Sequence, residues 1–202
     1  AYHFNGDMKG VGVYNDALTA DEIADRYNGE SVSDHLVSLW DLDESGGAIV
    51  TDSGVSSNAG RVNGASWSGT NLAEPVALSF DGTDDYVNCG NDASLNITDN
   101  MTLEGWINTT SSDFQLLVNK QSAASSRRGY QMGLYQGRLF FWTDGIGGLR
   151  ISSITVNDGQ WHHVAVTASG ATGTIYVDGE VRGTFTYTAA GDNSAADLIL
   201  GK

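Results

Sequence analysis

The chain has 202 residues, of which 40% are hydrophobic, and it contains 26 glycines and one proline. This length and this hydrophobic fraction fit one all-β sandwich with a single sizeable core. Twenty-five acidic and ten basic residues give a formal net charge of −15. Such a surface repels phosphate backbones, so no nucleic acid is expected as a partner. No stretch approaches the roughly 18 apolar residues of a membrane span, so no membrane insertion is expected.

The acidic surplus has two interpretations that the sequence leaves open. It can serve solubility in a salty external medium, or some of the carboxylates can hold Ca²⁺, which prefers oxygen ligands. The single cysteine, Cys89, excludes an internal disulfide. Its alternating surroundings are typical of a small buried apolar residue.

A short helix is expected near the front of the chain. Thr19 can cap its first turn, and Glu22, three residues later, completes a capping box. Leu18 and Ile23 occupy the two positions of a hydrophobic staple around this start. The helix is expected over residues 20–28.

From residue 36 onward the sequence predicts one strand after another. In residues 101–108, Leu103 and Ile107 share one face, while Glu104 and Trp106 share the other. Further strands are expected over residues 76–80, 114–119, 130–135, 138–143, 149–153, 162–168, 174–178, 182–187 and 197–200.

Turn signals separate several of these strands. Asp178 and Gly179 lie between two apolar runs and suit the positive φ angles of a type I′ hairpin turn. Gln136 and Gly137 form a weaker signal of the same kind. Closely spaced strands with no helix between them favour an antiparallel β-sandwich.

Several segments together resemble the laminin G-like and pentraxin domains, of the bacterial type, of the concanavalin A-like lectin/glucanase superfamily. These segments are residues 40–47 (WDLDESGG), 78–87 (LSFDGTDDYV), 102–107 (TLEGWI), 159–166 (GQWHHVAV) and 175–179 (IYVDG). The resemblance covers nearly all of residues 36–202. It implies an all-β fold, a concanavalin A-like antiparallel β-sandwich (jelly roll) with one short helix.

The front of the chain resembles the end of such a domain. Residues 4–18 resemble the family's last strand, and residues 19–27 its closing helix, although both precede the opening strand. We therefore expect one domain over residues 1–202, with its closing strand and helix in permuted position at residues 1–28 and its main body at residues 36–202. A circular permutation and a cut out of phase with a tandem repeat both explain this order.

The front segment is expected to complete the sandwich. A jelly roll without its last strand exposes a row of unpaired backbone groups and an open core. Residues 8–14 are therefore expected to form a strand beside residues 36–42, with the helix laid over an edge. The segment can close its own chain or fill the slot of a neighbour.

The sequence lacks the catalytic pattern of glycosidases on this fold class. These enzymes place two or three carboxylates at alternating strand positions. The nearest match, residues 41–44 (DLDE), has the wrong spacing, and Glu104 stands alone on its strand. His162 and His163 are adjacent, so in a strand they point to opposite faces. The chain is not expected to be an enzyme.

Asp81, Asp84 and Asp85 crowd one turn between two strands and are the candidate Ca²⁺ ligands. Aspartates in turns also commonly accept hydrogen bonds from their own backbone. The resemblance implies a Ca²⁺ near the rim of the domain. However, Lys9 and Gly10 stand where relatives carry an acidic pair. A Ca²⁺ bound here is expected to be structural.

Carbohydrate is the candidate ligand, because aromatic faces stack on sugars while polar side chains read the hydroxyls. Trp106 with Glu104, and Trp142 with Tyr135 and Arg128, could line one concave sheet face. Alternatively, each aromatic side chain belongs to the core.

These observations favour a non-catalytic binding module of a secreted or surface protein, most simply a carbohydrate-binding or adhesive one. Its partner would be a glycan or polysaccharide, outside the cell, on a cell surface or on a virion. Two alternatives remain open. One is a structural or assembly module that contacts neighbouring protein domains, and the other is an accessory domain of a polysaccharide-degrading enzyme. The function rests on the resemblance, since fold alone does not define function.

Overall fold

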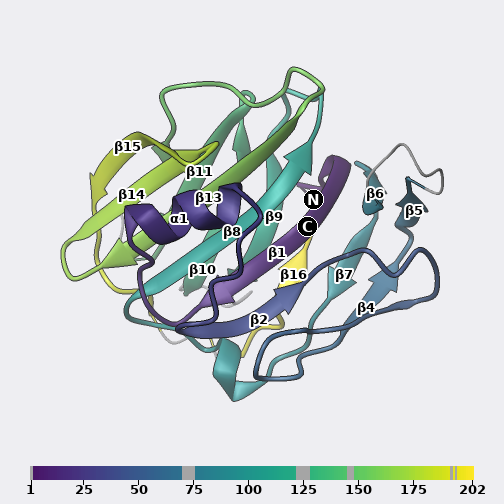
Figure 1. Ribbon diagram of the computed structural model, residues 1–202, viewed down its shortest axis with the longest axis horizontal. Coiled ribbons are helices and arrows are strands. Elements are labelled where there is room, and N and C mark those ends of the chain that lie inside the picture. Colours follow the sequence, from purple (N-terminus) through teal and green to yellow (C-terminus); the bar gives the residue numbers. More distant parts are fainter. Residues whose placement is uncertain (1, 70–75, 122–127, 145–147, 192, 194) are drawn as a thin grey trace.

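The computed structural model describes the chain except residues 1, 70–75, 122–127, 145–147, 192 and 194. The described residues form two antiparallel sheets that pack face to face, with one α-helix on the outside (Figure 1). Sheet A contains β1 (Asn5–Tyr14), β2 (Leu36–Trp40), β5 (Ser66–Ser68), β6 (Ala77–Asp81), β8 (Met101–Asn108), β13 (Trp161–Ser169), β14 (Thr172–Val177) and β15 (Glu180–Thr186). Sheet B contains β3 (Ile49–Val50), β4 (Gly60–Asn63), β7 (Tyr86–Asn88), β9 (Gln115–Gln121), β10 (Gly129–Tyr135), β11 (Arg138–Thr143), β12 (Arg150–Ile151) and β16 (Ile199–Leu200).

This architecture is the concanavalin A-like antiparallel β-sandwich that the sequence predicts. The strands of sheet A follow the order β15-β14-β13-β8-β1-β6-β5, and β2 also pairs with β1. Sheet B follows the order β12-β11-β10-β9-β16-β7-β4-β3. The short strands β3, β4 and β5 have no counterpart among the strands expected from the sequence.

The two hairpin turns expected from the sequence are confirmed. Asp178 and Gly179 both have positive φ angles, 55° and 76°, between β14 and β15. Gln136 and Gly137 have φ angles of 53° and 71° between β10 and β11. Two successive positive φ angles define a type I′ turn, whose twist matches that of the strands it joins.

Strand β1 lies in the middle of sheet A. It pairs antiparallel with β8 along one side and with β6 and then β2 along the other. The pairing of β1 with β2 joins the residues that were expected to lie together. Because β1 is central and not at an edge, its apolar side chains enter the core, and Val11 and Val13 are both almost fully buried.

Helix α1 (Ala20–Tyr27) begins with the predicted capping box. The Thr19 side chain accepts a hydrogen bond from the Glu22 amide, and the Glu22 carboxylate accepts one from the Thr19 amide. The helix lies on the outer face of sheet A and not over an edge as expected (Figure 1). Ile23 anchors it there, in a small apolar cluster with Ala165 of β13 and Tyr176 of β14.

Candidate functional site

One continuous row of residues crosses the outer face of sheet B. Register pairing joins its members in turn across seven strands, from β11 to β3. We call it the sheet B row, and its members are Trp142, Gln131, Asn119, Ile199, Asn88, Arg61 and Ile49. With a strand spacing of about 4.8 Å, the row is about 29 Å long.

The sheet B row faces outward. Every member is half-buried or exposed. The residues one position along each strand form a parallel row that belongs to the core, and it includes Phe141, Met132, Val118, Leu200 and Val87. Successive side chains of a strand point to opposite faces, so a core row on one side places the sheet B row on the other.

Amide groups dominate the middle of the row and are partly pre-ordered. The Gln131 amide donates to Oδ1 of Asn119 at 3.0 Å. The Asn119 amide in turn donates to the backbone oxygen of Lys202, and the Asn88 amide donates to Asp197. Hydrogen bonds hold these side chains against the strands, which presents donors and acceptors in fixed positions.

An aromatic cluster lies on the same outer face, toward the β10–β11 turn. Phe114 is its centre, with ring centroids 5.9 Å from Tyr135, 4.9 Å from Phe140 and 4.6 Å from Tyr2. Phe140 is fully buried beneath the others, whereas Tyr135 is 37% exposed. Trp142 follows Phe140 on the same face of β11, so Trp142 and Tyr135 share one surface.

Arg128 lies apart from this surface. It is exposed, immediately precedes β10 and packs beside Gly191. Trp106 and Glu104 are farther away still, because β8 belongs to sheet A. The structure therefore separates Trp142 and Tyr135, on sheet B, from Trp106 and Glu104, on sheet A, and Arg128 belongs to neither pair.

Glu104 is the centre of a buried ion cluster beneath α1. Its side chain is inaccessible to solvent and accepts hydrogen bonds from Nε of Arg26 at 2.7 Å and from the hydroxyl of Tyr14 at 2.9 Å. Its other oxygen lies 3.0 Å from Nε2 of His163. Burial alone would raise the pKa of Glu104, but the hydrogen bond to His163 and the charge of Arg26 outweigh it and hold the pKa below its ordinary value. The structure thus places Glu104, a candidate ligand contact in the sequence, beneath α1 and out of contact with solvent.

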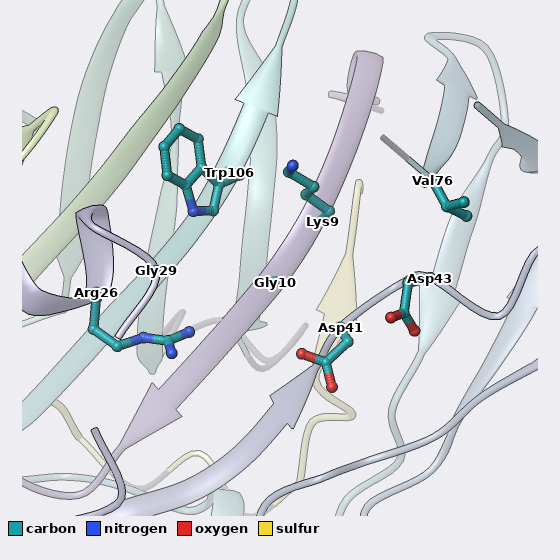
Figure 2. A pocket seen from close by; sticks show the side chains of 8 residues that line it. All are labelled: Lys9, Gly10, Arg26, Gly29, Asp41, Asp43, Val76 and Trp106. Carbon is teal, nitrogen blue, oxygen red and sulfur yellow. The ribbon is translucent and has the colours of Figure 1, made fainter. Parts of the chain in front are cut away.

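Trp106 stands beside a hollow on the outer face of sheet A (Figure 2). Tyr27 of α1 stacks on its ring at a centroid distance of 5.7 Å, which covers one indole face. The ammonium group of Lys9 lies 5.6 Å from the Trp106 ring and 4.8 Å from the Trp161 ring. Trp106 therefore contributes an edge to the hollow and not an open stacking platform.

The hollow has a volume of about 420 Å³ and carries charges of both signs. Figure 2 shows Lys9 on β1, Arg26 at the end of α1, and Asp41 and Asp43 beyond the end of β2. Arg26 is already paired with Glu104, and Asp41 accepts a hydrogen bond from the hydroxyl of Ser53. Two of the four charged groups, Arg26 and Asp41, therefore already have partners within the protein.

The turn after β6 gathers the three candidate metal ligands. One carboxylate oxygen each from Asp81, Asp84 and Asp85 lies within 4.8 Å of the others. Asp85 also accepts a hydrogen bond from the Asp81 amide at 2.8 Å, and Asp81 accepts one from the Thr83 amide at 2.7 Å. The carboxylates thus fit a hard cation, and two of them also brace the turn, as the alternative interpretation expects.

His162 and His163 are engaged on opposite faces of β13. His163 belongs to the Glu104 cluster, while Nδ1 of His162 lies 2.8 Å from Asp178 and its Nε2 lies 3.1 Å from Asp158. Asp178 in the β14–β15 turn is thereby tied to Asp158 in the loop before β13. Both histidines make structural contacts.

The sequence pattern of the concanavalin A-like lectin/glucanases superfamily matches residues 81–202. The chain belongs to this family, as the motifs predict. No curated protein matches the chain. None of the helices in the described part of the chain is long and apolar enough to cross a membrane.

Two solved structures are similar to the chain at low sequence identity, and the first of them shares its fold. The botulinum neurotoxin serotype D binding domain matches 81% of the chain at 12% identity, with a TM-score of 0.58. Domains LG4-5 of the mouse laminin α1 chain match 52% of the chain at 21% identity, with a TM-score of 0.42. The matches span 43% and 28% of these two solved chains, respectively.

Proposed function

We propose that this chain is a non-catalytic, carbohydrate-binding module of a secreted or surface protein, and that its ligand lies along the sheet B row. The observation that carries the proposal is the row itself: an indole at one end, three amides and a guanidinium on a continuous outward face. Aromatic faces with a few fixed polar groups are the usual means of holding a sugar. Membership of a superfamily of lectins and glucanases supports the same class of ligand by analogy.

The ligand best suited to the row is a linear glycan chain with little charge. The row crosses seven strands without a break, so it matches a polymer laid across the strands and not a single sugar. Arg61 is its one ionisable member. Asp197, which accepts from Asn88, offsets that positive charge. An anionic polysaccharide would therefore gain little electrostatic attraction at this row, and it would be repelled by a chain with a net charge of −15.

A glycan array of neutral and acidic polysaccharides, probed with and without Ca²⁺, tests this proposal. We expect binding to neutral linear glycans, and we expect Trp142→Ala to weaken it. Trp161→Ala is the matched control, because it removes another half-buried indole, but from sheet A. An array without any signal at high protein concentration would favour the assembly module instead. Products of hydrolysis or elimination would overturn the non-catalytic assignment.

A further inference from the structure

Residues 1–28 form a unit attached to the rest of the domain by one exposed connection. Residues 28–35, between α1 and β2, are exposed except for Val32, which is half-buried. In contrast, β1 lies between β8 and β6, where it provides the middle of sheet A. The side chains of this segment that enter buried positions are Phe4, Met8, Val11, Val13, Tyr14, Leu18 and Ile23.

The N-terminal end of this segment lies beside the C-terminal end of the chain. The Phe4 amide donates a hydrogen bond to the backbone oxygen of Gly201 at 2.9 Å. The Leu116 amide donates to the backbone oxygen of Tyr2 at 3.0 Å, so residues 2–4 run along the ends of β9 and β16. Figure 1 shows the two termini close together on the sandwich.

Strand β1 occupies a position between β8 and β6 that we call the slot. We infer that the slot is an interaction surface for residues 1–28 of a second copy of this chain, which would reach it from the end of the chain at Lys202. A following copy joined to Lys202 would start beside the entrance of the slot. Four residues, Lys202 and the copy of residues 1–3, connect Gly201 to the incoming Phe4, and four residues reach up to about 14 Å. That reach exceeds the separation that a hydrogen bond between Phe4 and Gly201 requires.

Exchange of the segment costs little free energy, because the incoming segment makes the contacts that the resident one makes. Burial of the large apolar side chains of the segment contributes the same free energy whichever copy fills the slot. The slot cannot remain empty without exposing unpaired strand edges on both sides. Exchange passed along a series of copies is head-to-tail, and it generates an open array unless the rotation between copies closes a ring. This inference is independent of the glycan proposal.

The test appends a second copy of residues 1–28 directly after Lys202 and disables the resident copy with Val11→Asp and Val13→Asp. In the unextended chain, these two substitutions should abolish the cooperative melting transition, because they bury two carboxylates in the core. With the appended segment intact, we expect the melting temperature to return to within a few degrees of the native chain.

Two control chains complete the experiment. Disabling only the appended segment should leave the native melting temperature, and disabling both segments should abolish folding again. If the extended chain with a disabled resident segment also lacks a cooperative melting transition, the slot accepts its segment from one end only and the inference is wrong.

Discussion

Arg26 on α1 and Glu104 on β8 form an ion pair of 2.7 Å that joins the closing helix to the middle of sheet A. Glu104 is inaccessible to solvent and also contacts His163 and Tyr14, so the pair is part of a network. A buried carboxylate with three partners is costly to disrupt, because each remaining partner is left buried without its counterpart. The network therefore holds α1 on the sheet.

Glu104→Gln should lower the free energy of unfolding by about 3–5 kcal/mol. The reason is that the neutral amide no longer balances the positive charge of the Arg26 guanidinium. Urea unfolding measures the change. The matched control is Glu180→Gln, which removes an exposed partner of Arg182 and should cost no more than about 1 kcal/mol. Equal effects of the two substitutions would contradict the structural role of the cluster.

His162 should make stability depend on pH. Burial opposes its charge, but Asp178 and Asp158 outweigh burial and raise the pKa of His162 above its ordinary value. A raised folded-state pKa stabilises the protein at pH values below the unfolded pKa of about 6.5. This contribution is lost as the pH rises through the folded-state pKa.

His162→Gln should therefore lower stability most below about pH 6 and least at alkaline pH. Unfolding free energies measured across this range for both proteins give the comparison. A difference between them that stays constant with pH would show that His162 contributes by packing and not by charge.

Ca²⁺ should raise the melting temperature if the Asp81–Asp85 turn binds it. Ligand at 100 times its Kd stabilises by about 2.7 kcal/mol, or about 5–10 °C for a chain of this size. Asp84→Asn should remove the shift and leave the melting temperature in chelator unchanged, because Asp84 is exposed. Asp85→Asn should lower stability even in chelator, since Asp85 holds the Asp81 amide. Identical melting curves in Ca²⁺ and in chelator would exclude the metal.

Local features of the fold were predictable because their causes are local. The Thr19–Glu22 capping box and the Asp178–Gly179 turn each depend on residues within a few positions of one another. Alternation likewise placed Glu104 and Trp106 on one face of β8. Alternation could not show that α1 covers this face, because the partners of Glu104 are distant in sequence. Arg26 is separated from it by 78 residues and His163 by 59.

The sheet B row could not be predicted for a related reason. Gln131, Asn119 and Asn88 lie on strands that are distant in sequence, and their alignment depends on the register of every intervening pair. The aromatic residues were recognisable as candidates, since Trp142 and Tyr135 share a face with Phe140. Amides in an alternating strand resemble any solvated position until the neighbouring strands are known.

The most direct test of the account is the Kd for the best-bound neutral glycan of the array, measured by isothermal titration on the native chain and on Gln131→Thr/Asn119→Thr. Threonine favours strands, so the double variant should keep its melting temperature. We predict a Kd at least about tenfold weaker, equivalent to about 1.4 kcal/mol. The control Gln160→Thr, an exposed amide just before β13, should bind as the native chain does. A Kd unchanged by the double substitution would contradict a glycan site on the sheet B row.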